Sequence, residues 1–265
     1  MALVPFLSIK ASPGTSVAAT AIAAVGLTSD PTTLVECDPM GGDAAARFGL
    51  ALQPGLVSLA VDLERAADVS AAAVSELVHR HSQQLPGGLP VVVAPPSPEE
   101  MRAPLERLAE DLPRADCPTI ADCGRLESAS AHARTPIMRL VQRAGLCVVV
   151  SRPVLSELQH LHAWLPVLQG LRVRVLLLLS QRGGYSADEI SASLGVPVIG
   201  TLPHDSLGAS VLTGAGGGLP ARRLALLRAA RPVAAALARE LPLAPHGEDS
   251  AVADSRLVPL AGAGA

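Results

Sequence analysis

The sequence predicts a doubly wound α/β fold, with a mainly parallel sheet of about seven strands and helices on both faces. Short apolar runs alternate along the chain with longer segments of helical period. Several of the runs, such as VRVLLLL and LCVVV, are continuously apolar, which is typical of parallel strands that are covered on both sides. A composition of 49% hydrophobic and 17% charged residues indicates a globular protein with a large core.

The expected elements follow one another in strand–helix order. Runs of Val, Ile and Leu predict strands at Leu3–Ile9, Thr33–Glu36, Leu89–Ala94, Thr119–Asp122, Leu146–Ser151, Val173–Ser180 and Pro197–Thr201. Segments rich in Ala, Leu, Glu and Arg predict helices at Ser16–Leu27, Val57–Ala66, Ser70–Gln83, Pro98–Leu112, Ala133–Ala144, Val154–Leu168, Ala187–Leu194 and Ala221–Leu241. Pro-rich stretches between these elements indicate loops within one domain.

We expect a single domain over residues 1–241 and a flexible tail over residues 242–265, which is rich in Ala, Gly, Pro and Ser. No apolar run approaches the roughly 18–20 residues that would cross a bilayer, so stable membrane insertion is not expected. A net charge of −3 gives no global argument for a nucleic-acid or membrane partner. The apolar N-terminus lacks a basic region and a cleavage site, and we expect a cytoplasmic protein.

Cysteines and histidines predict no metal centre. The four cysteines form no CxxC pair and are expected to be buried, reduced thiols. The H-x-H pairs at His79/His81 and His160/His162 would point in different directions on helices, so we expect four surface histidines.

The loop after the first strand, KASPGTS, is the sharpest functional feature. In a phosphate-binding loop, backbone N–H groups and the positive end of the next helix converge on an anion. Small residues let the backbone approach the phosphate, and Ser16 stands where a hydroxyl would bind Mg²⁺. The standard pattern G-x-x-x-x-G-K-[ST] is not met, because Thr15 occupies the lysine position. An ordinary strand–turn–helix with a serine cap is the alternative.

This loop resembles the deviant Walker A loop of the ParA/MinD ATPase family, K-G-G-x-G-K-[ST]. Lys10 matches the family's signature lysine, Gly14 its third glycine and Ser16 its Mg²⁺ hydroxyl, whereas Ala11, Ser12 and Thr15 depart from the pattern. The resemblance implies that Lys10 reaches across a dimer to the partner's phosphates, as a catalytic residue. It also implies a nucleotide cradle formed by Lys10, Ala11, Ser12, Pro13, Gly14, Thr15 and Ser16.

Further motifs follow in the family's order. VECDPMGGD resembles its second-strand motif, in which Asp38 would orient the attacking water and share in the Mg²⁺ site with Ser16. PTIADCG resembles the Walker B strand, with Asp122 on a water of the Mg²⁺ shell. VLLLLSQRG and GVPVIGTLPHD resemble the base-side segments, which implies nucleotide contacts at Gln181, Pro203 and Asp205. From spacing alone, Glu36 and Asp38 would share an acid or Mg²⁺ task, with a solvated pair as the alternative.

The absent lysine bears on hydrolysis. Loss of a charge-assisted hydrogen bond of roughly 1.5–3 kcal/mol weakens phosphate binding by roughly 10–150-fold. We expect ATP and Mg²⁺ to be bound weakly to moderately and ATP hydrolysis to be slow or absent, unless Lys10, Arg125 or Arg152 supplies the missing charge.

The resemblance implies a homodimerising nucleotide switch that positions DNA, a division site or a secretion or pilus assembly. The alternative is a non-hydrolysing scaffold that binds a partner motor ATPase, or a partition or secretion component. An unrelated α/β enzyme that binds a small phosphate compound is a third alternative. For the arginine-rich last helix, non-specific DNA contact, membrane-surface contact and mere solvation are the alternatives, and solvation is the ordinary one.

Overall fold

The computed structural model describes residues 3–10, 12–66, 70–126, 135–181, 183–214 and 224–241. Its centre is an eight-stranded sheet in the order β3-β4-β2-β5-β1-β6-β7-β8, parallel except for β3. The strands are β1 (Leu3–Ser8), β2 (Thr33–Glu36), β3 (Gln83–Gln84), β4 (Pro90–Val92), β5 (Thr119–Arg125), β6 (Leu146–Ser151), β7 (Arg174–Ser180) and β8 (Val198–Leu202).

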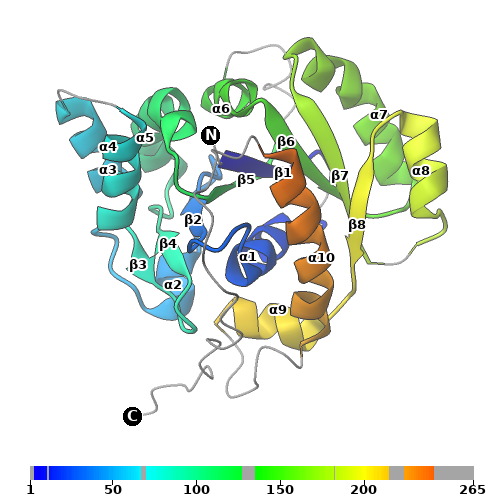
Figure 1. Cartoon of the computed structure of the whole chain (residues 1–265), viewed down its shortest axis with the longest axis horizontal. Coiled ribbons are helices and arrows are strands. Elements are labelled where there is room, and N and C mark those ends of the chain that lie inside the picture. The colour runs from blue at the N-terminus through cyan, green and yellow to red at the C-terminus, as the bar shows by residue number, and fades with distance from the viewer. Residues whose placement is uncertain are drawn as a thin grey trace.

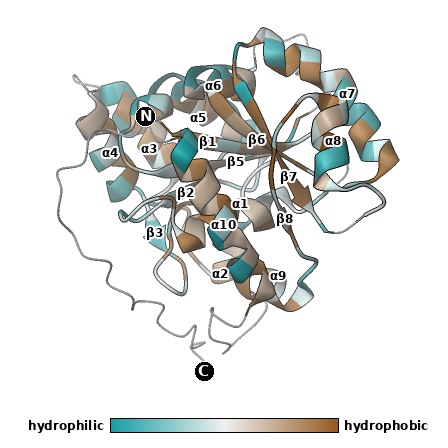
Figure 2. Ribbon diagram, turned by 45° about the vertical axis from the view of Figure 1, so that its right-hand side comes forward, coloured by the Kyte–Doolittle hydropathy of each residue, from teal (hydrophilic) through white to brown (hydrophobic). Residues whose placement is uncertain are grey.

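Helices cover both faces of this sheet (Figure 1). On one face lie α1 (Thr15–Val25), α2 (Ala44–Phe48), α9 (Ser206–Leu212) and α10 (Ala225–Glu240). On the other face lie α3 (Leu56–Arg65), α4 (Ala71–Arg80), α5 (Pro98–Asp111), α6 (Pro136–Ala144), α7 (Leu155–Gly170) and α8 (Ala187–Leu194), and a 3₁₀ turn (Leu112–Arg114) follows α5. The strands are mostly apolar along their length and the polar residues lie toward the outside of the helices (Figure 2), so each face carries its own core.

The predicted fold class is confirmed, and each of the seven predicted strands is present, with bounds that agree within two residues except at the end of β5, which extends three residues further than predicted. The prediction missed β3, which it placed at the end of a helix, because two glutamines at a sheet edge carry no apolar pattern. It also missed α2 and α9, which have only five and seven residues. The predicted flexible tail and the Gly-rich stretch 214–218, except Gly214, lie outside the described residues.

The four cysteines are buried and free, as predicted. The prediction of four surface histidines is wrong for His81, which is only 6% exposed. Its ring lies between the Ser58 hydroxyl at 2.8 Å and the Asp62 carboxylate at 2.9 Å, and these contacts tie α3 to the end of α4. The helical period of the sequence could not predict the burial of His81, because both of its partners are about 20 residues away in sequence.

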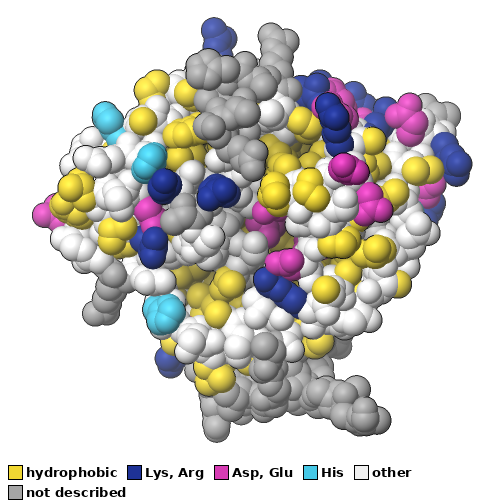
Figure 3. Space-filling view, turned by 180° about the vertical axis from the view of Figure 1, so that it is seen from behind, with side chains coloured by type: hydrophobic (Ala, Val, Ile, Leu, Met, Phe, Trp, Pro, Cys, Tyr) yellow, Lys and Arg dark blue, Asp and Glu magenta, His cyan; other side chains and the backbone are white. Residues whose placement is uncertain are grey.

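Charges are mixed on the surface rather than gathered by sign. On the face that Figure 3 shows, basic and acidic side chains are interspersed, with apolar side chains between them. The arginines Arg228, Arg231 and Arg239 of α10 are exposed, while Arg222 and Arg223 lie outside the described residues. Within the described ranges, no helix has the length and apolar character needed to cross a bilayer.

Candidate functional site

The carboxyl ends of β1, β2, β5, β7 and β8 meet at one edge of the sheet, as parallel pairing requires. Doubly wound folds bind ligands at this edge, where neighbouring connections leave in opposite directions. Here the chain leaves β1 toward β2 on one side, while β6 and β7 continue on the other. The candidate residues in the described ranges lie at or beyond these strand ends, except Asp122, which lies within β5 beside the end of β2.

Gly14 forms the turn from β1 into α1. Its φ of 90° and ψ of 37° lie in the left-handed region, which glycine adopts without the strain that a side chain brings. The first intrahelical bond runs from the Ala18 N–H to the Gly14 carbonyl at 2.8 Å, so the N–H groups at the start of α1 remain available to an anion. Ala11 lies outside the described residues.

Thr15, at the position of the usual lysine, is turned into the protein. It is 6% exposed, and its buried hydroxyl oxygen has no hydrogen-bond partner in the described part of the chain. A buried hydroxyl without a partner costs about 1–3 kcal/mol. The Thr15 side chain supplies no charge to the loop, unlike the lysine that usually occupies this position.

Ser16, Asp38 and Asp122 are brought together around one small pocket of about 60 Å³. Pairing of β2 with β5 sets Glu36 beside Asp122, and the Cys37 N–H donates to the Asp122 carbonyl at 2.8 Å. Asp43 and Arg47 of the α2 region line the same pocket. The predicted convergence of the two aspartates on the loop after β1 is therefore present.

Burial raises the pKa of Asp122 to about 6. Hydrogen bonds from the Ser16 side chain and the Gly124 N–H act in the opposite direction, and the negative charges of Asp38 and Glu36 raise the pKa further. The ionised form of a carboxyl group is unfavourable when it is buried beside other negative charges. A bound Mg²⁺ or its water shell would stabilise that ionised form.

Asp38 is fixed from two sides. Its carboxylate accepts the Met40 N–H at 2.8 Å, which orders the turn after β2. It also lies against Gly124, where a Cβ would fall only 1.9 Å from an Asp38 oxygen. Gly124 has a φ of 60° and follows a register shift between β1 and β5, so the backbone of β5 makes room for this carboxylate.

Glu36 has a structural task, and the acid or Mg²⁺ task that its spacing from Asp38 indicates stays a prediction. Its carboxylate accepts three backbone N–H groups at 2.8–2.9 Å, from Asp43, Ala44 and Ala94. Burial raises the pKa of Glu36 and these three bonds oppose that shift. The side chain thereby anchors the start of α2 to the end of β4, contacts that lie up to 58 residues apart in sequence.

A second cavity, of about 210 Å³, adjoins the loop after β1. Ser12, Pro13 and Gly14 line it on one side, and the predicted residues Gln181, Pro203 and Asp205 line it on the other. Asp205 is committed to structure, because its two oxygens accept the Gly208 N–H at 2.8 Å and the Leu226 N–H at 2.9 Å. Prediction missed Ser180, whose buried hydroxyl also lacks a partner among the described residues, because serine at a strand end carries no pattern.

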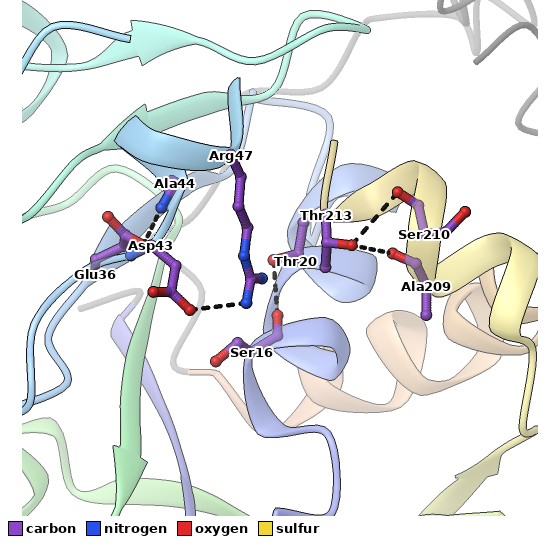
Figure 4. Close-up of polar contacts among 9 residues, drawn as sticks. All are labelled: Ser16, Thr20, Glu36, Asp43, Ala44, Arg47, Ala209, Ser210 and Thr213. Atoms are coloured by element: carbon purple, nitrogen blue, oxygen red, sulfur yellow. Dashed lines mark hydrogen bonds and ion pairs between the residues drawn. The ribbon is translucent and has the colours of Figure 1, made fainter. Parts of the chain in front are cut away.

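The cations lie differently from expectation. Lys10 is exposed, and it forms no ion pair with another described residue. Arg152 pairs with the buried Glu157, and Arg125 lines a separate cavity beside Met101 and Cys123. Arg47, which prediction did not consider, extends from α2 toward Ser16 and Thr20 of α1 (Figure 4). It pairs with Asp43 at 2.7 Å.

The donor set fits a magnesium nucleotide. The Ser16 hydroxyl and the carboxylates of Asp38 and Asp122 are the oxygen ligands that Mg²⁺ prefers, and Mg²⁺ usually takes one or two carboxylates together with phosphates and water. Among the described residues, no three or more His, Cys, Asp or Glu side chains form a group that could hold a metal ion. The Ser180 hydroxyl, which lines the adjoining cavity and has no partner among the described residues, is a further polar group at the site that a ligand would satisfy.

Solved structures of positioning ATPases share this architecture. The cell division ATPase MinD of Pyrococcus furiosus aligns with a TM-score of 0.66 at 16% identity, over 91% of this chain and 100% of that one. The chain has the MinD/ParA fold. A ParA family ATPase from Chlorobium tepidum gives 0.65 at 18% identity over 89% and 97%, and MinD of Pyrococcus horikoshii with Mg-ADP gives 0.58 at 15% over 88% and 93%. No protein-family model and no curated protein sequence matches the chain.

The MinD/ParA fold accounts for the order of the motifs. In this chain the loop after β1, the end of β2 and β5 meet at one corner, where Ser16, Asp38 and Asp122 line one pocket. The strand β3 pairs antiparallel with β4 at one edge of the sheet.

Proposed function

We propose that this chain binds a magnesium nucleotide at the loop after β1 and acts as a dimerising switch in the positioning of an intracellular cargo, in the cytoplasm. The convergence of Ser16, Asp38 and Asp122 on one pocket carries the proposal. The phosphates would lie on the N–H groups at the start of α1, Mg²⁺ beside Ser16 and Asp122, and the base toward Gln181 and Pro203. Two relatives in fold were solved with Mg-ADP and with AMPPNP, which supports this class of ligand.

Weak or absent hydrolysis is part of the proposal. Thr15 offers a neutral hydroxyl where charge on the β–γ bridge would be stabilised. Asp38, fixed by Met40 and packed on Gly124, is placed to orient a water molecule. The chain thus keeps the positioning groups and lacks the phosphate-binding lysine at the Thr15 position, which favours binding over turnover.

Dimerisation over the nucleotide edge is supported by the exposed apolar side chains. Met40, Leu155, Tyr185 and Leu207 are each more than 40% exposed, and each lies in the segment that follows a parallel strand. They surround the same edge as Lys10, which is free to reach a second copy of the chain. Where such side chains form a contiguous patch, they typically mark a contact surface.

The scaffold function is the second candidate, and the burial of Thr15 in place of a lysine favours it. A scaffold would keep the fold and bind a partner motor ATPase or assembly through this surface. It would show the same monomer–dimer distribution with and without Mg-ATP. The switch would shift toward dimer only with Mg-ATP, as measured by light scattering on a sizing column.

Nucleotide binding is expected to raise the melting temperature. Mg-ADP or Mg-ATP at 100 times Kd stabilises the folded state by about 2.7 kcal/mol, roughly 5–10 °C for a chain of this size. Gly14→Val should remove that response, because a β-branched residue strains the left-handed turn and displaces the cradle.

The matched control is Gly88→Val. Gly88 also has positive φ and open space where a Cβ would lie, but it belongs to the turn between β3 and β4. The Gly88→Val protein should lose stability similarly and keep the nucleotide response. A melting temperature that stays constant up to millimolar Mg-ATP and Mg-ADP in the unaltered protein would contradict nucleotide binding.

A further inference from the structure

The pocket at Ser16 holds an excess of negative charge. The side chains of Glu36, Asp38, Asp43 and Asp122 line it, and Arg47 is the one cationic side chain among the described residues that do so. A nucleotide brings further negative charge to this place, and the loop that should offset it carries Thr15. Bound Mg²⁺ would offset part of this charge, and a side-chain cation beside the phosphates would lower the repulsion that remains.

Arg47 is placed to do so. It lies one residue before the end of α2, and the carboxylate of Glu36 fixes the start of that helix through the N–H groups of Asp43 and Ala44. The Gly214 region packs against the Arg47 backbone, where a Cβ on Gly214 would fall 2.5 Å from the Arg47 carbonyl oxygen. The backbone of Arg47 is therefore held on two sides while its side chain extends over α1 (Figure 4).

The bond that occupies Arg47 is weak enough to exchange. Its partner Asp43 is 71% exposed and lies four residues earlier, an arrangement that contributes only about 0.3–0.5 kcal/mol. A phosphate oxygen is a better partner, because the planar guanidinium can donate two parallel hydrogen bonds to it. Exchange of Asp43 for phosphate needs only side-chain rotation, since Ser16 and Thr20 already line the same pocket.

We propose that Arg47 is the phosphate-binding cation of this site, replacing from α2 the lysine that the loop after β1 lacks. This inference rests on the proposed nucleotide site. It assigns Arg47 a direct contact with the phosphates on the Mg²⁺ side, where Ser16 and Asp122 lie. The site would then combine the start of α1, carboxylates that follow β2 or lie in β5, and a positive charge from α2.

Equilibrium titration with Mg-ADP and with Mg-AMPPNP tests the proposal. Arg47→Ala should raise both dissociation constants by a factor of about 10–100, the worth of a charge-assisted hydrogen bond. Arg47→Lys keeps the positive charge but lacks the planar guanidinium group. Its dissociation constants should lie between those of the unaltered protein and those of Arg47→Ala. The matched control is Arg80→Ala, which removes an equivalent exposed pair with Glu76 four residues earlier, on α4. It should leave both constants unchanged.

The outcomes separate the two proposals. If the unaltered protein binds neither nucleotide, the nucleotide site and the role of Arg47 both fail. If it binds them and Arg47→Ala binds as well as Arg80→Ala, the role of Arg47 alone is overturned. Titration with Mg²⁺ alone covers the remaining case: a large gain of Mg²⁺ affinity in Arg47→Ala with unchanged nucleotide affinity would show that Arg47 merely neutralises the aspartates, and would also overturn it.

Discussion

Asp122→Asn is expected to make the protein without ligand more stable at pH 8, by about 1–3 kcal/mol. Burial raises the pKa of Asp122 from 3.8 to about 6, so the folded state resists ionisation of this carboxyl group. Between pH 4 and pH 6 the unfolded chain releases the proton first, and stability falls as the pH rises. Above pH 6 Asp122 is ionised in the folded state as well, and this ionisation lowers the stability by at most about 3 kcal/mol. The uncharged amide of Asn avoids that loss.

Urea denaturation from pH 4.5 to pH 8 measures this effect. The gain from Asp122→Asn should be largest at pH 8 and shrink as the pH falls through 6, whereas Asp30→Asn, an exposed control, should show no such trend. With Mg-ADP the unaltered protein should be the more stable of the two, because Asp122→Asn loses the carboxylate that would face the metal. If the unaltered protein and Asp122→Asn are equally stable at pH 8, ionisation of Asp122 does not destabilise the folded state, which would contradict this prediction.

Gly124→Ala is expected to destabilise the protein by about 2–4 kcal/mol and to impair the acidic pocket. Two costs add at this position. A side chain is strained at a φ of 60°, and the new Cβ would lie 1.9 Å from an oxygen of Asp38. The carboxylate must move, which breaks its bond to the Met40 N–H and displaces a group of the Mg²⁺ pocket.

Gly145→Ala separates these two costs. Gly145 closes α6 with a φ of 70°, and nothing lies within 4 Å of the position that a Cβ would take there. The Gly145→Ala protein should lose only about 1 kcal/mol, from backbone strain alone. Denaturation of the two variants side by side gives the difference. If Gly124→Ala costs no more than Gly145→Ala, Asp38 is not packed on β5 as described.

The parallel sheet could be predicted from the sequence because it depends on local patterns, and the main residues of the site could be predicted from motifs that resemble those of the ParA/MinD family. Continuous apolar runs mark strands that are buried on both faces, and the carboxyl ends of such strands must share an edge. The resemblance to the ParA/MinD motifs selected Ser16, Asp38 and Asp122, and the shared strand edge explains why these three residues line one pocket.

The remainder depends on contacts between distant residues. Helix α2 has too few residues to show a period, and it is anchored by Glu36. Because α2 was not predicted, Arg47 could not be placed beside the site. The arginines that the sequence offers as candidates for the missing positive charge are Arg125 and Arg152, which lie elsewhere. Asp205 matched a base-side motif, yet its oxygens cap α9 and bind the Leu226 N–H, which no local pattern indicates.

The central claim is that the loop after β1 and the ends of β2 and β5 form one magnesium–nucleotide site. A crystal structure with ADP and Mn²⁺ in place of Mg²⁺ tests it most directly, since the anomalous signal locates the metal. We expect the metal at about 2.1 Å from the Ser16 hydroxyl oxygen, with Asp122 one water further and the phosphates on the N–H groups of residues 14–16. A metal bound elsewhere, or phosphates away from α1, would contradict the account.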